Sequence, residues 1–187
     1  MLRIALGQME VFPGRPDINT KTMLTMIEEA RRERAQVVVF PEMSIPGYFL
    51  GDTWEQQAFL RDCEEYGRLL IEASAGLCVL FGNVGVDWDK VGDDGRTRKY
   101  NAFFIAQDGK LAQDNQFPYP FRIKALQPRY REFDERHFYS LRRLAQDLGK
   151  SIADLLQPVV LNIAGETVKL GVMLGEDGWG NAHSLKP

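Results

Sequence analysis

Hydrophobic and polar residues alternate over residues 1–10, and this period of two predicts a β-strand that is buried on at least one face. After the break at Pro13 and Gly14, apolar residues recur at helical spacing over about residues 17–33, which predicts an amphipathic helix. Residues 36–40 form a short apolar run rich in valine, as is typical of a fully buried strand. A strand, an amphipathic helix and a buried strand in succession favour an α/β layer.

The rest of the chain continues with alternating helical and extended patterns. A second helix is expected from residue 54 to about residue 74, with Thr53 and Gln56 as a candidate capping box at its start. A hairpin is expected around Asp108 and Gly109, followed by a long loop over residues 122–135, where no clean period exists. The other expected elements are strands at residues 78–82, 100–107, 111–115, 158–163 and 168–174, a helix at about 134–148 and a helical turn at 151–156.

Composition narrows the class of protein. The chain has 187 residues, of which 44% are hydrophobic and 26% charged, and its net charge is −3, which is ordinary for one globular domain. The mild acidity argues against a general nucleic-acid binder, and no apolar run is long enough to span a membrane. The N-terminus lacks the features of a signal peptide. We therefore expect a cytoplasmic enzyme or binding module without a nucleic-acid or membrane partner.

The two cysteines, Cys63 and Cys78, are expected to be free buried thiols rather than parts of a disulfide framework. Together with two histidines they cannot supply a zinc site built from two Cys-x-x-Cys pairs. No metal site is predicted from the sequence.

Three segments carry residues with candidate chemistry. Glu42 follows a predicted buried strand and Pro41, at the sheet edge where α/β folds bind ligands, although a solvated loop glutamate is the more common explanation for such a residue. Lys124 lies in a basic segment that a solvated face would also explain. Residues 170–180 lead from a strand into a sharp turn, where hydrolases place a nucleophile, but the residue at this turn is Gly175. The glycine spacing in this segment does not match a dinucleotide fingerprint.

Taken together, these segments resemble the nitrilase (carbon–nitrogen hydrolase) superfamily. Residues 4–8 and 37–48 follow the opening of that family nearly position by position, and residues 174–179 are similar to its Cys-Glu-Asp-x-Trp turn. Residues 49–52 and 128–138 look most like the glutaminase domain of glutamine-dependent NAD synthetases. The resemblance covers the whole chain and implies an α/β fold of the α-β-β-α sandwich type.

The resemblance also implies a triad of glutamate, lysine and cysteine that hydrolyses amides. Glu42 would act as the general base, Lys124 would stabilise the oxyanion of the tetrahedral intermediate, and the cysteine would attack the amide carbonyl. Glu135 matches a second, positioning glutamate. The substrate-binding residues that the resemblance implies are Tyr48, Tyr130, Glu176 and Trp179.

The resemblance breaks at Gly175, which stands where the family has its nucleophilic cysteine. Neither Cys63 nor Cys78 is placed to substitute, so we expect the chain to lack glutaminase activity. The chain also ends at Pro187, before the remaining strands and helices of the sandwich and without a synthetase domain. We expect a single, C-terminally incomplete domain over residues 1–187, truncated after the nucleophile turn, that a homo-oligomer or a partner chain completes.

Three functions remain open at the level of sequence. The first is a glutaminase-like domain that supplies ammonia for NAD synthesis and is inactive here because of Gly175. The second is another amidase or a carbamoylase of the nitrilase branch, and the third is a non-catalytic assembly module. The expected substrate is a small amide such as glutamine, and no cofactor is implied, since NAD would belong to the absent synthetase domain.

Overall fold

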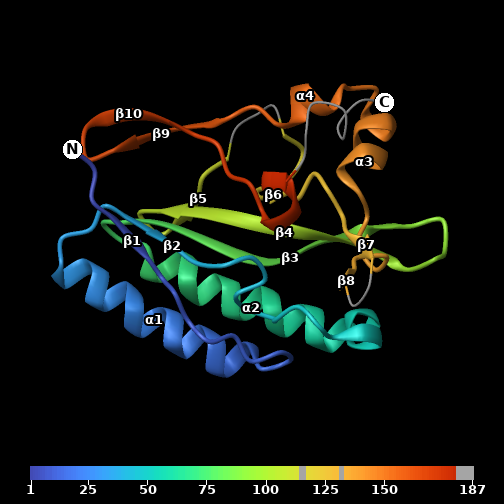
Figure 1. The fold of residues 1–187 in the computed structure, drawn as a ribbon, viewed down its shortest axis with the longest axis horizontal. Coiled ribbons are helices and arrows are strands. Elements are labelled where there is room, and N and C mark those ends of the chain that lie inside the picture. The colour runs from blue at the N-terminus through green and yellow to red at the C-terminus, as the bar shows by residue number, and fades with distance from the viewer. Residues whose placement is uncertain (114–116, 131–132, 180–187) are drawn as a thin grey trace.

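The computed structural model describes residues 1–113, 117–130 and 133–179, and arranges them in layers (Figure 1). Two long helices lie below a mixed β-sheet, and a β-hairpin lies above it. Within the described residues the sheet has six strands in the order β1-β2-β3-β4-β5, with β6 also paired to β4. The elements are β1 (Ile4–Leu6), α1 (Pro16–Arg32), β2 (Val37–Val39), α2 (Gln57–Ala73), β3 (Cys78–Val91), β4 (Thr97–Gln107), β5 (Lys110–Leu111), β6 (Arg122–Ile123), β7 (Arg129–Tyr130), β8 (Phe133–Asp134), α3 (Leu141–Leu148), α4 (Ile152–Leu155), β9 (Val159–Ile163) and β10 (Glu166–Leu170).

The two faces of the main sheet carry separate cores. On one face, Met23 and Ile27 of α1 pack with Leu60 of α2 against Val38 and Val79 of the sheet. The helix α1 lies where the apolar period predicts it, because its buried residues share one stripe. The helices, the main sheet and the β9–β10 hairpin thus form three of the layers that an α-β-β-α sandwich requires.

On the other face, the hairpin supplies the covering side chains. Val159, Leu161 and Ile163 of β9 are buried against β2, β3 and β4. Their period of two matches the pattern that predicts this strand, and β9 pairs antiparallel with β10 as a separate two-stranded sheet.

The first strand is predicted correctly as a strand that packs on one face, but it is shorter than expected and its larger apolar side chains lie on the uncovered face. β1 has only three residues, and its apolar side chains Ile4 and Leu6 are 56% and 78% exposed. Only Ala5, on the opposite side of the strand, packs against the helix-side core. Neither Ile4 nor Leu6 belongs to the core under the hairpin, to which β2, β3 and β4 supply the side chains of the main sheet.

The second helix begins later than predicted, and its capping box does not form. Residues Gly51–Glu55 are a 3₁₀ helix, and α2 starts after Gln56, whose backbone is extended. No side chain caps this N-terminus, so the expected pairing of Thr53 with Gln56 is wrong. The predicted hairpin at Asp108 and Gly109 is confirmed, with both residues at positive φ as a tight two-residue turn requires.

The segment predicted as a loop over residues 122–135 contains three short strands instead. β6 pairs with β4, and β7 pairs with β8. Because β8 occupies residues 133–134 in that pairing, the third helix starts at Leu141 rather than at residue 134, with Ser140 as its N-cap. The helical turn at α4 is confirmed, and Asn115, at the end of a predicted strand, lies outside the described residues.

Two further expectations can be checked in the fold. Cys63 and Cys78 are buried and free, as predicted. In the described part of the chain, no helix has both the length and the apolar character needed to cross a bilayer.

Candidate active site

Three charged side chains that lie far apart in the sequence meet at one end of the main sheet. Glu42 follows β2, Lys124 follows β6 and Glu135 follows β8. The ammonium Nζ of Lys124 lies 2.7 Å from Glu42 Oε1 and 2.5 Å from Glu135 Oε1. The structure therefore brings together three of the side chains that the sequence singled out.

A close backbone contact positions Glu42. Gly82 of β3 lies against the Pro41–Met43 segment, where an added Cβ would be 2.3 Å from the backbone nitrogen of Met43. Any larger residue would push this loop away from the sheet. The loop is also fixed by hydrogen bonds that Gly82 N donates to Pro41 O and that Ile45 N donates to Gly82 O, both at 3.2 Å.

Burial governs the electrostatics of the cluster. The side chains of Lys124 and Glu135 are 2% and 1% exposed, whereas that of Glu42 is 20% exposed. Burial raises the pKa of Glu135, and the opposing effect of Lys124 only partly offsets it. Burial alone would lower the pKa of Lys124, but the charges of Glu135 and Glu42 outweigh it and raise that pKa. Lys124 is thus held as an ammonium between two carboxyl groups.

Two further residues donate hydrogen bonds to this cluster, although Asn101 Oδ1 and Glu135 Oε2 are buried without a hydrogen-bond partner among the described residues. Asn101 of β4 is fully buried and donates from Nδ2 to Glu42 Oε1 at 2.6 Å and to Glu135 Oε1 at 3.1 Å. Tyr48 donates its hydroxyl to Glu135 Oε1 at 2.8 Å. Sequence reasoning missed Asn101. A signal was present, namely a single amide within an apolar strand, because a buried polar group needs a hydrogen-bond partner.

Gly175 begins the turn that faces the cluster. Its φ is +42°, and a Cβ built on it would lie 2.5 Å from Glu42 Oε2 and 3.7 Å from Lys124 Nζ. A side chain at this position would therefore point at the predicted base and the predicted oxyanion-binding lysine. Gly175 itself presents no reactive atom there.

Asp177 ties this turn to the segment that carries Lys124. Its Oδ1 accepts from the backbone nitrogens of Ala125 at 3.0 Å and Leu126 at 2.7 Å, and its Oδ2 accepts from Leu174 N at 3.1 Å. One carboxylate thus satisfies three backbone donors and fixes the distance between the turn and the lysine. Sequence reasoning did not assign Asp177 to the site.

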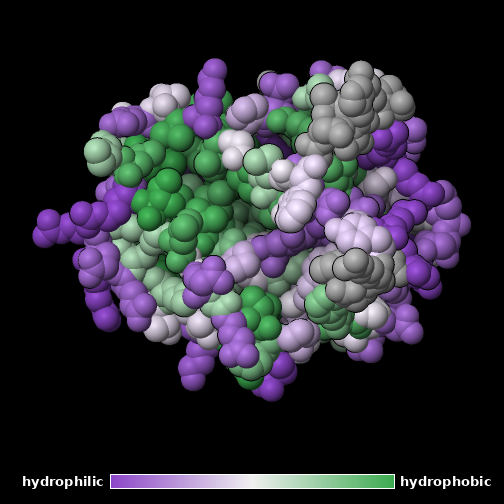
Figure 2. All heavy atoms as spheres, viewed as in Figure 1, coloured by the Kyte–Doolittle hydropathy of each residue, from purple (hydrophilic) through white to green (hydrophobic). Residues whose placement is uncertain are grey.

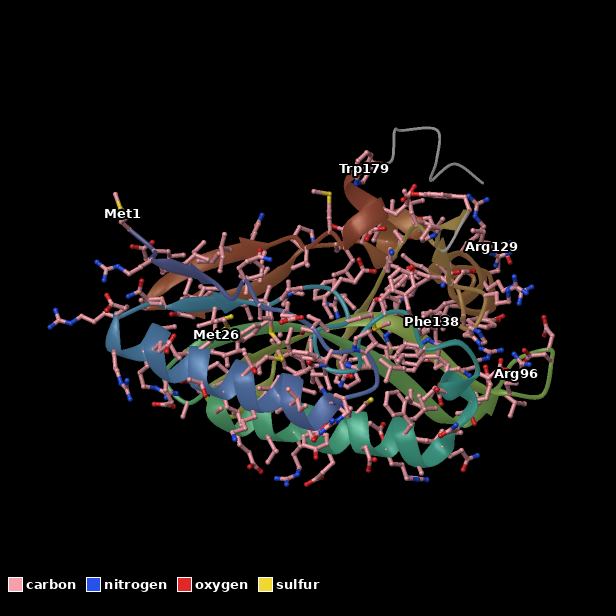
Figure 3. The ribbon with its side chains drawn as sticks, turned by 60° about the horizontal axis from the view of Figure 1, so that its bottom comes forward. Met1, Met26, Arg96, Arg129, Phe138 and Trp179 are labelled. Atoms are coloured by element: carbon pink, nitrogen blue, oxygen red, sulfur yellow. The ribbon has the colours of Figure 1, made fainter. Side chains whose placement is uncertain are left out.

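A cleft of about 370 Å³ opens between the cluster and the turn. Tyr130 and Glu176 form one wall and are joined by a hydrogen bond of 3.0 Å from the tyrosine hydroxyl to Glu176 Oε2. Trp179 is 85% exposed and lies at the outer end of the turn (Figure 3). All four predicted substrate-binding residues line this cleft, and the full lining consists of Glu42, Tyr48, Phe49, Lys124, Pro128, Tyr130, Gly175, Glu176 and Trp179.

Neither cysteine of the chain belongs to this cleft. Cys63 is buried in the core between α2 and the sheet, and Cys78 is buried under the hairpin. Burial raises the pKa of both thiols, that of Cys78 to about 11. Both are therefore unsuited to replace a nucleophile at Gly175.

Comparison with known proteins places this chain in a family. Residues 3–179 match the family model described as carbon–nitrogen hydrolase. The glutamine-dependent NAD(+) synthetase of Xanthomonas campestris pv. campestris is 27% identical over 179 residues, which are 95% of this chain and 27% of the relative. That of Thermotoga maritima is 28% identical over 180 residues, which are 95% of this chain and 26% of the relative. The chain thus spans about a quarter of the length of these relatives.

Solved structures share the fold. A glutamine-dependent NAD+ synthetase from Acinetobacter baumannii, in complex with ADP, aligns with a TM-score of 0.70 at 24% identity, over 95% of this chain and 28% of the other. An amidase variant from Nesterenkonia sp. AN1, with the acetamide moiety of fluoroacetamide added covalently at its active-site cysteine, aligns with a TM-score of 0.63 at 17% identity, over 90% of this chain and 54% of the other. Because the family model matches nearly the whole of this chain, the chain belongs to the carbon–nitrogen hydrolase family of the nitrilase superfamily.

Proposed function

We propose that this chain is a glutaminase-type carbon–nitrogen hydrolase domain that still binds a small amide but does not hydrolyse it. The observation that carries the proposal is the geometry at Gly175, where a side chain would point at Glu42 and Lys124 but none is present. Covalent amide hydrolysis in this geometry needs a nucleophile at that position. Without one, the remaining groups can bind and polarise an amide but cannot form an acyl intermediate with it.

The retained groups suit an amide ligand. Lys124 is an ammonium whose Nζ borders the cleft, so it can donate a hydrogen bond to an amide carbonyl oxygen. Glu42 Oε2 faces the turn and can accept a hydrogen bond from an amide N–H. Tyr130 and Glu176 would contact the rest of the substrate from the opposite wall.

Glutamine is the amide that the relatives favour. The curated relatives described above are glutamine-dependent NAD(+) synthetases, and ammonia supply for NAD synthesis is the role we propose for the ancestor of this domain. The amidase structures share the fold at 17–18% identity and give no observation that favours a different amide. The absence of a side chain at Gly175 favours a binding or assembly role for the present chain.

The experiment compares wild type with Gly175→Cys, and uses Gly175→Ala as the matched control that adds a Cβ without a thiol. We expect wild type to bind glutamine in titration calorimetry but to release no ammonia from it. Lys124→Met should abolish the binding. Gly175→Cys should form a γ-glutamyl thioester that is visible by intact mass spectrometry, whereas Gly175→Ala should not.

Ammonia release by wild type at a rate above that of Lys124→Met would overturn the proposed loss of hydrolysis. Absence of glutamine binding by both wild type and Gly175→Cys would instead overturn the assignment of glutamine as the ligand.

A further inference from the structure

A second cleft, of about 230 Å³, lies apart from the one at Gly175 and shares no lining residue with it. Its walls are the turn between β3 and β4, the segment that leads into α3, and α3 itself, which lie at one end of the molecule (Figure 1). Figure 2 shows many hydrophilic side chains over this end. We call it the basic cleft, because two of its lining residues are acidic, Asp93 and Asp94, whereas five carry a positive charge, namely Arg96, Arg98, Lys99, Arg136 and Arg143.

The inner cations of the basic cleft are buried and held in place. The side chains of Lys99 and Arg98 are 2% and 15% exposed. Lys99 Nζ donates to Glu55 Oε2 at 2.9 Å, and Arg98 donates to Asp147 Oδ2 at 2.6 Å. The guanidinium carbon of Arg98 also lies 4.1 Å from the centroid of the Tyr139 ring. A ligand that meets these groups does not have to order them, which makes binding more favourable.

One carboxylate is shared between two of these cations. Glu55 accepts a hydrogen bond from Arg96 at 3.3 Å in addition to the one from Lys99. Its Oε1 also lies 2.8 Å from His137 Nδ1. Asp94, which also faces Arg96, is 3.7 Å away and 60% exposed, so water screens this pair. These contacts leave an excess of positive charge beside the basic cleft.

Two guanidinium groups of the basic cleft meet at one aromatic ring. Those of Arg98 and Arg143 both lie over the ring of Tyr139, with their central carbons 4.1 Å and 5.8 Å from its centroid. Asp93, which faces Arg143, is 3.7 Å away and 85% exposed, so this ion pair is weak. Thr97 adds a hydroxyl to the lining. Guanidinium groups and hydroxyls are donors that suit the oxygens of a phosphate.

We propose that the basic cleft binds a phosphate dianion, either inorganic phosphate or the phosphoryl group of a monoester. A tetrahedral dianion can accept hydrogen bonds from Arg98, Lys99 and Arg143 at the same time, whereas a carboxylate offers two oxygens and one charge. The volume of about 230 Å³ lies below the roughly 300–1,000 Å³ of sites for drug-sized ligands, so the cleft accommodates a phosphoryl group rather than a whole nucleotide. The site is independent of the amide cleft and of any activity there.

The test titrates the full chain with inorganic phosphate, with glycerol phosphate and with acetate by calorimetry at about pH 8, where the phosphates are dianions. Sodium chloride keeps the ionic strength equal in all titrations, so that general screening is constant. We expect saturable binding of both phosphates and none of acetate. The tighter of the two phosphates identifies the source of the ligand, and either result supports the proposal.

Variants of exposed arginines then test the site itself. Arg143→Gln and Arg96→Gln should each bind phosphate about tenfold more weakly, because a hydrogen bond between charged groups is lost. Both side chains are exposed, at 59% and 49%, so the variants should keep the far-ultraviolet circular dichroism of wild type. Arg68→Gln is the matched control and should bind as wild type does, because Arg68 is 50% exposed, has the same charge and lines no part of the cleft.

Amide chemical shifts measured by NMR locate the bound anion. Phosphate should shift the signals of residues 92–99 and 136–143 and leave those of α1 unchanged. Wild-type affinity in both Arg143→Gln and Arg96→Gln would overturn the proposal, as would acetate binding as tight as that of phosphate. Shifts spread evenly over the whole chain would also overturn it, because they would indicate diffuse association of counterions.

Discussion

Placing a side chain at position 175 should destabilise the fold. Gly175 has φ +42°, and an alanine in the left-handed region costs roughly 1–2 kcal/mol. Its Cβ would also lie 2.5 Å from Glu42 Oε2, so the carboxylate must move. Moving it weakens the hydrogen bonds from Lys124 at 2.7 Å and Asn101 at 2.6 Å, and a hydrogen bond to a charged group contributes about 1.5–3 kcal/mol.

The two costs together predict that Gly175→Ala lowers the free energy of unfolding by about 3 kcal/mol. A double-mutant cycle with Glu42→Ala separates them, because without the carboxylate only the backbone cost of roughly 1–2 kcal/mol remains. The cycle should therefore give a coupling energy of about 1.5 kcal/mol between the two positions. Urea unfolding at pH 7, followed by tryptophan fluorescence and by circular dichroism, measures all four proteins.

A coupling energy below about 0.5 kcal/mol would refute the predicted contact, because that is the range in which independent sites add. An unchanged stability of Gly175→Ala in the wild-type background would refute the backbone argument as well. Gly175→Cys should behave as Gly175→Ala does in this assay, because the strain resides in the Cβ and not in the thiol.

Other predictions concern the buried carboxyl groups and the thiols. Burial raises the pKa of Glu135 above its ordinary value of 4.5, so the folded state holds this proton more tightly than the unfolded state does. The free energy of unfolding of wild type, relative to that of Glu135→Gln, should therefore fall as pH rises from 4.5 through the raised pKa. Urea unfolding at a series of pH values measures this difference, and a relative stability that rises with pH would contradict the assignment. Asp177→Ala leaves three backbone donors without their carboxylate, so it should lower the free energy of unfolding by about 3 kcal/mol and speed hydrogen exchange in the turn. As a control, Glu176→Gln should change the free energy of unfolding by less than about 1 kcal/mol. Cys63 and Cys78 should react with Ellman's reagent at pH 8 only after denaturation, because burial raises the pKa of both thiols, and rapid labelling of the native protein would show that one of them is accessible.

The local sequence pattern was sufficient to predict an element where the residues of that element alone determine its structure. The stripe of α1, the run at β2 and the Asp108–Gly109 turn are all found where the period or the turn chemistry predicts them. Prediction failed where a tertiary contact competes with the local preference. The helix was predicted to begin at about residue 134, but residues 133–134 pair with β7 and α3 begins only after Ser140.

The site could be predicted in its order of motifs but not in its contacts. Glu42, Lys124 and the turn at Gly175 were identified because their motifs follow one another in the family's order. Asn101 and Asp177 were missed because nothing in a single sequence says which groups an amide or a carboxylate faces. Both act by hydrogen bonds across more than 50 residues of chain, with Glu42 and with the backbone of Ala125.

By itself the sequence determined the main helices and strands, the family and the glycine at position 175, because these depend on residue identity and on spacing along the chain. Only the tertiary structure decided which side chains are charged, buried or covered. Lys124 is held as an ammonium because two carboxyl groups from other strands converge on it. Ile4 and Leu6 belong to an apolar strand pattern yet are exposed, because burial depends on what lies above a strand and not on the strand itself.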